Sequence, residues 1–391
     1  MKYNFDEIIN RGGTSATKLE GMYENWRRTD LIPLWIADMD FATAPFVMEA
    51  IIQRCKTPVL GYTAKPESYY QAIIRWLNTR YGLKAEKENI QFVSGIVPGI
   101  GLALNALTKK GDKVLIQPPV YGPFHWLNER NERTLITNPL KLVDGTYRMD
   151  MEAFRKQVKG CKVFILCNPH NPGGIVWKEE ELQEIAEICY EEGVLVFSDE
   201  IHADLTLPPC KHRPFATISE KARTNSITFM SPSKAFNMPG LTASHALIFN
   251  DNLRKKFRKH IETCEFDLGH VFAFLAVEAA YSNGTEWLEQ CLAYVQKNIN
   301  YVDDFLKQNT PKIKIIRPQA SFLLWLDCRE MGLSQEALND FFIDKAHLAL
   351  NDGASFGTEG TGFMRMNIAS PRSILEKAMA QLAEAYQTYI S

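Results

Sequence analysis

VFILCNPHNPGG, at residues 163–174, is the stretch of this 391-residue chain that decides its fold. Five apolar residues, 163–167, lead into two Asn-Pro steps and a pair of glycines. An apolar run without polar alternation is typical of a strand that is covered on both faces of a sheet. The Asn-Pro and Gly-Gly steps indicate a rigid polar turn where that strand ends. Taken alone, the turn is equally consistent with an ordinary strand-to-helix connection.

Similar apolar runs recur on both sides of this stretch, and helical patterns lie between several of them. The clearest helix is expected at 179–192, where Leu182, Ile185 and Cys189 share one face. Gly193 follows at the position where helices often end. The alternation predicts an α/β fold with a mostly parallel, seven-stranded sheet flanked by helices. The expected strands are 90–93, 113–116, 133–136, 163–167, 194–198, 227–230 and 246–249.

The C-terminal part of the chain follows a different pattern. A long helix is expected at 284–308, followed by apolar runs at 312–316, 322–326 and 363–368. We therefore expect a second, smaller α/β domain. The predicted organisation is an N-terminal segment that packs with the small domain, a large domain and a C-terminal small domain, at 1–45, 46–280 and 281–391. No linker rich in Gly, Ser and Pro separates them, so the sequence marks the boundary near 280 only approximately.

The composition is that of an ordinary globular protein, with 46% apolar and 23% charged residues. A net charge of −2 argues against nucleic acid or an anionic membrane as a partner. No apolar run reaches the roughly 18 residues of a membrane helix, and the first residues lack a signal-peptide layout, so we expect a cytoplasmic protein. The eight cysteines form no CxxC pair, which indicates reduced thiols and predicts no metal site.

Two charged residues stand where the chemistry of an open parallel sheet is expected, beyond the carboxyl ends of its strands. Asp199 directly follows the run 194–198, and a carboxylate buried there needs a cationic partner. Lys234 follows the run 227–230 in an SPSK turn, where small and apolar neighbours can lower the pKa of an amine. Each also has a simpler interpretation, since Asp199 could cap the next element and Lys234 could be solvated.

In this order, HNPGG, Asp199 and Lys234 together resemble the fold-type I enzymes of the aminotransferase class I/II superfamily, which use pyridoxal 5′-phosphate (PLP). The resemblance implies that Lys234 holds the cofactor covalently and moves the proton of the substrate's Cα. It implies that Asp199 pairs with the pyridinium nitrogen, which lets the ring accept electrons. Asn171 and His202 would contact the ring hydroxyl, and Tyr121 would stack on the ring. For His202 and Tyr121 the alternative is a packed structural side chain.

The same resemblance implies a site for the cofactor's phosphate, and an active site that two subunits share. In the stretch SGIVPG, the N–H groups of Gly95 and Ile96 would bind the phosphate at the start of a helix, and Ser231 would add a hydroxyl. Thr242 occupies the position at which many relatives place an arginine, so that contact is absent or replaced. Tyr62 resembles the tyrosine that reaches the phosphate from the neighbouring subunit, which implies a homodimer with shared active sites.

The resemblance also implies a site for the substrate, a small amino acid. Arg365 would hold its α-carboxylate, because a guanidinium suits a planar carboxylate. Arg372 is the nearest competitor, and a structural salt bridge is the alternative for either arginine. Ala37, Asp38 and Tyr121 would line the substrate pocket.

A finer series resembles one branch of this superfamily, the MalY/PatB type of cystathionine β-lyase, also called cysteine-S-conjugate β-lyase. The series is LWIADMDF, GYT, GIVPG, NPHNP, DEIH and HRPF. The resemblance implies cleavage of L-cystathionine or related cysteine S-conjugates to a thiol (homocysteine), pyruvate and ammonia. A PLP-dependent aminotransferase is the alternative, because it would use the same residues. A non-catalytic protein of this fold, with a regulatory or partner-binding role, is a third interpretation.

Overall fold

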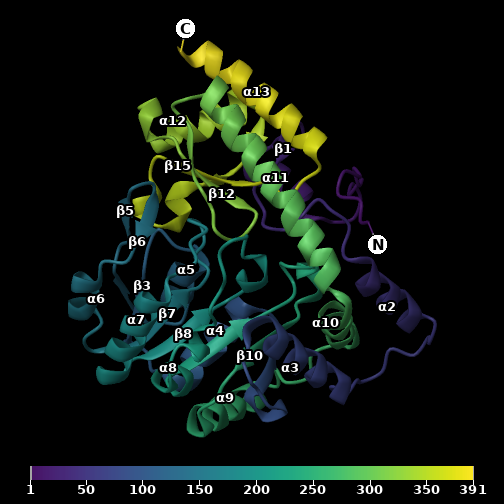
Figure 1. Ribbon diagram of the computed structural model, residues 1–391, viewed down its shortest axis with the longest axis vertical. Coiled ribbons are helices and arrows are strands. Elements are labelled where there is room, and N and C mark those ends of the chain that lie inside the picture. The colour runs from purple at the N-terminus through teal and green to yellow at the C-terminus, as the bar shows by residue number, and fades with distance from the viewer. Residues whose placement is uncertain (1, 391) are drawn as a thin grey trace.

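The structure is a computed structural model that describes residues 2–390 (Figure 1). Its larger part is built around a seven-stranded sheet. Its strand order is β2-β10-β9-β8-β7-β3-β4, and β10 is the one strand of this sheet that runs opposite to the others. The strands are β2 (Ile90–Val93), β3 (Lys113–Ile116), β4 (Thr134–Thr137), β7 (Cys161–Cys167), β8 (Leu195–Asp199), β9 (Ser226–Met230) and β10 (Ser244–Leu247). The predicted mostly parallel sheet is confirmed, with β10 shifted from the expected 246–249.

Helices cover both faces of this sheet, which explains why its strands read as continuous apolar runs. Along β7, Val163 and Ile165 face one core cluster, and Phe164 and Leu166 face another. The helices of this part of the chain are α3 (Glu67–Tyr81), α4 (Ile96–Leu107), α5 (Pro123–Arg130), α6 (Met151–Gln157), α7 (Glu179–Glu191), α8 (Glu220–Thr224), α9 (Asp251–Thr263) and α10 (Val271–Asn283).

A smaller antiparallel sheet, of order β11-β12-β15-β14, lies above the large one in Figure 1. Its strands are β11 (Lys314–Ile316), β12 (Leu323–Asp327), β14 (Asn351–Asp352) and β15 (Phe363–Asn367). Two long helices, α11 and α13, pack together beside it, and α12 lies nearby. These helices are α11 (Thr285–Asn309), α12 (Gln335–Asp340) and α13 (Arg372–Ile390).

The N-terminal segment joins these two parts. β1 (Ile32–Pro33) pairs with β13 (Leu348–Ala349), which brings this segment beside the C-terminal strands. It also contains α1 (Thr17–Trp26) and leads into α2 (Pro45–Cys55), which packs against α10. A hairpin of β5 (Lys141–Val143) and β6 (Thr146–Arg148) completes the strands. The domain boundaries near 45 and 280 stay predictions.

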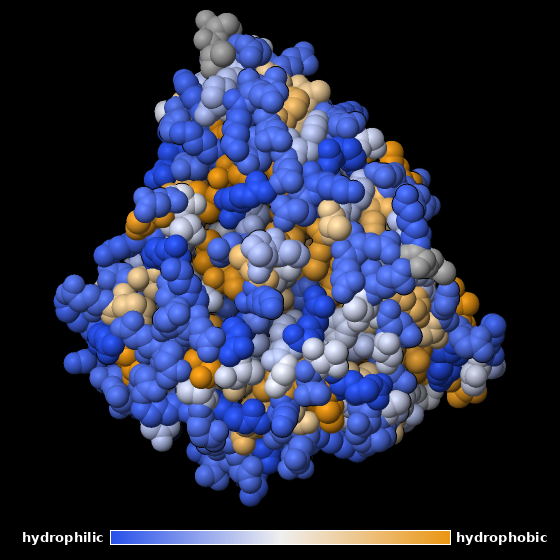
Figure 2. Space-filling model, in the orientation of Figure 1, coloured by the Kyte–Doolittle hydropathy of each residue, from blue (hydrophilic) through white to orange (hydrophobic). Residues whose placement is uncertain are grey.

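The face of the molecule shown in Figure 2 is mostly hydrophilic. Hydrophobic residues appear there in smaller groups, several of them across the middle of the molecule. Within residues 2–390, no helix is long and apolar enough to cross a membrane.

Candidate active site

A cavity of about 210 Å³ lies where β7, β8 and β9 end, next to the first turn of α4. The carboxyl ends of parallel strands are the usual place for a ligand in such a sheet. Residues far apart in the sequence meet at this cavity, such as Ala37 and Lys234, which are 197 positions apart and form a hydrogen bond. Eight residues predicted from the sequence line this cavity, namely Ala37, Gly95, Ile96, Tyr121, Asn171, Asp199, His202 and Lys234.

Asp199 ends β8 and is only 3% exposed. Its Oδ1 accepts a hydrogen bond from the N–H of Ile201 at 3.0 Å, and no ion pair joins it to a cation in the part of the chain that the structure describes. Burial raises the pKa of Asp199 to about 7. Because a buried carboxylate needs a cation to stay charged, this position fits a ligand with a positive group.

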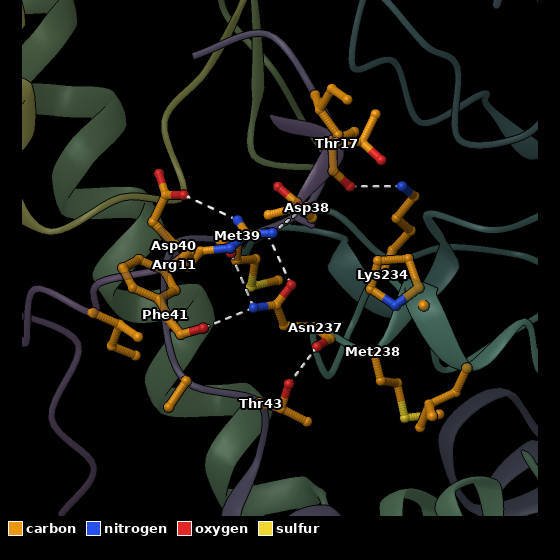
Figure 3. Close-up of a pocket in the computed structure, with 18 of the residues that line it drawn as sticks. Arg11, Thr17, Asp38, Met39, Asp40, Phe41, Thr43, Lys234, Asn237 and Met238 are labelled. Carbon is orange, nitrogen blue, oxygen red and sulfur yellow. Dashed lines mark hydrogen bonds and ion pairs between the residues drawn. The ribbon is translucent and has the colours of Figure 1, made fainter. Parts of the chain in front are cut away.

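Lys234 follows β9 and faces the same cavity. Its Nζ donates a hydrogen bond to the main-chain carbonyl of Ala37 at 2.6 Å (Figure 3). Burial and the charge of Arg365 lower the pKa of Lys234 to about 8, although Asp38 and Asp199 act in the opposite direction. An amine with this pKa is partly neutral near pH 7 and is therefore available as a nucleophile or base.

Arg365 lies on β15 and is 5% exposed. Its Nη1 donates to Asn171 Oδ1 at 3.3 Å, and its Nη2 donates to Trp35 O at 3.1 Å and to Asn351 Oδ1 at 2.5 Å. Its Nε has no hydrogen-bond partner, and no carboxylate within residues 2–390 forms an ion pair with it. Burial lowers the pKa of Arg365 to about 10. A buried guanidinium without a counter-ion fits an anionic ligand.

Arg372, the other candidate for the carboxylate, begins α13 and has different surroundings. Its Nε and Nη2 donate to Asn298 Oδ1 at 3.1 and 2.9 Å, and its guanidinium packs 4.4 Å from the ring centre of Tyr301. Both partners belong to α11. Of the two arginines, therefore, Arg365 is the one that contacts a residue of the cavity wall.

Gly95 caps the N-terminus of α4 with a φ of 124°, a value that glycine adopts without strain. A Cβ at this position would meet Cδ of Pro98 at 3.2 Å. The N–H groups of Ile96 and Val97 belong to the first turn of the helix, where they have no partner within the helix and favour an anion. Because all of these residues line the cavity, the helix start fits a phosphate group.

Ser231 does not line the cavity, which differs from the prediction. Its Oγ donates to Ala243 O at 2.6 Å and accepts from the N–H of Ser233 at 3.1 Å, so this hydroxyl closes the turn around Lys234. The hydroxyl-bearing residues in the wall are Ser233, Thr242 and Ser244, together with Tyr121.

His202 and Tyr121 supply uncharged groups to the wall. Burial lowers the pKa of His202 to about 3, so its imidazole is neutral, and its Nδ1 has no hydrogen-bond partner. The ring of Tyr121 packs edge-on against Phe124. Burial raises the pKa of Tyr121, so the phenol keeps its proton at neutral pH.

A wider groove of about 830 Å³ shares Lys234 and Ala37 with the cavity (Figure 3). Asp38 lines this groove, but its carboxylate pairs with Arg11 at 2.7 Å and lies 3.6 Å from Nζ of Lys18. The carboxylate of Asp38 is therefore already balanced by cations, unlike that of Asp199.

Tyr62 lies apart from both the cavity and the groove. Its side chain is fully exposed on the segment between α2 and α3, which loops out at the right of Figure 1. Within one subunit this tyrosine therefore contributes nothing to the cavity wall.

Comparison with known proteins identifies the family. The sequence profile of aminotransferase class I and II matches residues 29–382. The chain belongs to this family. It is 39% identical to cystathionine beta-lyase PatB of Bacillus subtilis, over 98% of this chain and 99% of PatB. Cystalysin from Treponema denticola, whose structure contains a PLP cofactor, matches with a TM-score of 0.96 and 33% identity over 99% of this chain and 100% of its own. A PLP-bound C–S lyase from Staphylococcus hominis matches with a TM-score of 0.91 and 36% identity over 99% of this chain and 98% of its own.

For this aminotransferase class I and II protein, the sequence did not predict the places of Ser233 and Ser244 in the cavity wall, nor those of Cys167 and Asn351. Cys167 ends β7, and its Sγ accepts the N–H of Asn171 at 3.3 Å; its place directly before the NPHNP turn is a signal that could have found it. Asn351 binds Arg365, which stands opposite it in the pairing of β14 with β15. A two-residue strand leaves no pattern in the sequence, so Asn351 had no such signal.

Proposed function

We propose that this chain is a PLP-dependent C–S β-lyase that cleaves L-cystathionine or related cysteine S-conjugates. The observation that carries the proposal is one cavity that holds both the amine of Lys234 and a buried Asp199 without a cation. The relatives support the reaction type, since PatB is named a cystathionine beta-lyase and the Staphylococcus hominis protein a PLP-bound C–S lyase.

The cavity fits the ring of PLP. The pyridinium nitrogen is the cation that Asp199 lacks, and Lys234 is the amine that would hold the cofactor's aldehyde carbon. Asn171 and His202 offer polar groups for the ring hydroxyl, and Tyr121 offers a ring for stacking.

The cavity also fits the phosphate of PLP. The N–H groups of Gly95 and Ile96, together with that of Val97, would bind it at the start of α4. In place of the Ser231 hydroxyl predicted above, we propose that the side chains of Ser233 and Thr242 complete this site, because both line the cavity.

The chain's own residues then account for β-elimination. Arg365 binds the α-carboxylate of the amino acid through its unpartnered Nε and its Nη groups. Lys234, in its neutral form, takes the proton from Cα. Bound PLP supplies an electron sink for the electron pair left at Cα. The sulfur leaves Cβ as a thiolate, which needs no strong acid because thiols have a pKa of about 8–9. With one water, the substrate yields a thiol, pyruvate and ammonia.

We also propose a homodimer in which Tyr62 of each subunit reaches the cavity of the other. Besides Tyr62, the apolar side chains of Val59, Leu60, Phe266 and Leu268 are more than half exposed. Lys65 pairs with Asp267 at 2.9 Å, which brings the two segments that carry these side chains together. A contiguous group of exposed apolar side chains is typical of an interface between proteins. Location in the cytoplasm stays a prediction.

A direct assay tests the reaction type. The protein saturated with PLP is incubated with L-cystathionine in the absence of a keto acid, and pyruvate and free thiol are measured. A lyase releases both continuously, and the Lys234→Ala variant releases neither. Turnover that depends on an added keto acid would instead identify an aminotransferase, and would contradict the proposal.

A further inference from the structure

Residues 35–41 (WIADMDF), here called the strap, contain no helix or strand and touch both cations of the proposed site. The carbonyl of Ala37 accepts from Nζ of Lys234 at 2.6 Å. The carbonyl of Trp35 accepts from Nη2 of Arg365 at 3.1 Å. A segment with no hydrogen-bonding pattern of its own must be held by other groups if these two carbonyls are to stay in place.

Asn237 holds the strap on the side of Lys234, three positions further along the same turn (Figure 3). Its Nδ2 donates to the carbonyls of Met39 and Phe41 at 3.0 and 2.7 Å. Its Oδ1 accepts from the N–H of Met39 at 2.9 Å, and its own carbonyl accepts from Oγ1 of Thr43 at 2.6 Å. Asn237 also has a φ of 52°, a conformation that asparagine adopts more readily than most residues.

Asn367 holds the strap as well, through other carbonyls than Asn237 does. It stands two positions after Arg365 on β15, and residues two apart on a strand point to the same face. Its Nδ2 donates to the carbonyls of Ile36 and Asp38 at 2.6 and 2.7 Å. Its main-chain N–H donates to Leu34 O at 2.8 Å. The side chain that would bind the substrate and the side chain that binds the strap therefore come from one short strand.

We infer that Asn237 and Asn367 are positioning residues. Together they fix the strap so that the carbonyl of Ala37 keeps the Lys234 amine aimed at one point, while Arg365 is held by the same segment. The inference rests on the proposed function only in that Lys234 moves the Cα proton and Arg365 binds the carboxylate. Small errors in the placement of a reacting group are costly, since a shift of about 1 Å can lower a rate about 100-fold.

Two single variants and their combination test this inference in the PLP-loaded enzyme. Asn237→Gly removes the side chain and tolerates the positive φ, and Asn367→Ala removes the second anchor. Each should lower kcat for the amino-acid substrate by about tenfold or more, with KM changed by less than about threefold, because Arg365 keeps Asn171 and Asn351. Since either change frees the same strap, the double variant should be no slower than the slower single variant.

Asn250→Ala is the matched control. Asn250 also uses both ends of its amide on main-chain groups, donating to Thr224 O and accepting from the N–H groups of Asn252 and Leu253, but at the start of α9. It should leave kcat unchanged, and its effect on stability should add to that of Asn237→Gly because the two sites share no partner.

Hydrogen–deuterium exchange of the apoprotein gives a readout that needs no substrate. Peptides covering residues 35–41 should exchange faster in Asn237→Gly and in Asn367→Ala, and at the native rate in Asn250→Ala. Faster exchange in a protein that cleaves neither cystathionine nor other cysteine S-conjugates would refute the proposed function but not the inference that Asn237 and Asn367 hold the strap. Native exchange, native kcat or additive losses in the double variant would overturn the inference. If Asn237→Gly does not fold, Thr43→Val, which removes one hydrogen bond to Asn237, should raise the exchange of the same peptides to a smaller extent.

Discussion

The buried carboxylate of Asp199 predicts how the protein without its cofactor responds to pH. The pKa of Asp199 is raised by burial to about 7 from its ordinary value of 3.8. Between these two pH values the folded chain keeps a proton that the unfolded chain has lost, so stability falls as the pH rises through this window. Because each tenfold difference in proton affinity is worth about 1.4 kcal/mol, the full loss above pH 7 is about 4 kcal/mol.

Asp199→Asn removes the charge and keeps an oxygen that can accept from the N–H of Ile201. Urea unfolding of the two apoproteins near pH 5 and near pH 8 measures the effect, because the titration of groups that Asp199 does not influence cancels between them. The pKa of Lys234, which the Asp199 charge raises, is the neighbouring value that changes with the substitution. From pH 5 to pH 8 the native apoprotein should lose about 3 kcal/mol more stability than the variant, since part of the loss is already present at pH 5. An equal difference in stability at the two pH values would refute the argument that burial raises this pKa.

Three further substitutions test individual contacts. Arg365→Ala should raise KM for the amino-acid substrate about 30-fold or more, because it removes the fork for the carboxylate, whereas Arg372→Ala should leave KM near native in steady-state assays. Gly95→Ala should weaken PLP binding about tenfold in a fluorescence titration, because a side chain is strained at a φ of 124°. Gly111→Ala, which also has a positive φ but open space around it, should lower only the melting temperature. Tyr62→Ala should leave the melting temperature within a few degrees of native but lower kcat, and native kcat would contradict a shared site.

The sequence predicted most of the large sheet because the cause of its pattern is local. Strands buried on both faces must be apolar throughout, and β7 and β9 therefore show in the sequence where they lie. Asp199 and Lys234 could be placed at strand ends for the same reason. The sequence could not predict which serine hydroxyl faces the cavity, because Ser231 and Ser233 belong to the same turn. Only the structure shows that the Ser231 hydroxyl is used in hydrogen bonds within that turn. The sequence placed residues 35–41 at the substrate pocket, but it could not show what holds them there, since Asn237 meets Met39 across 198 positions.

The unbalanced charges of the cavity also indicate how the site selects its ligands. Asp199 lacks a cation and Arg365 lacks an anion, so the charged form of each is stabilised by a ligand group of opposite charge. In the proposed function, the ring nitrogen of the cofactor would meet the first need and the α-carboxylate of an amino acid would meet the second. An amine without a carboxylate would leave the guanidinium of Arg365 buried and unpaired. A site that binds a charged group rejects an analogue without that group far more strongly than it rejects an analogue that differs by one methylene. Selection for the amino-acid head therefore follows from burial at Arg365, whereas selection among sulfur substituents must depend on the wider groove beside Lys234, whose walls are largely apolar.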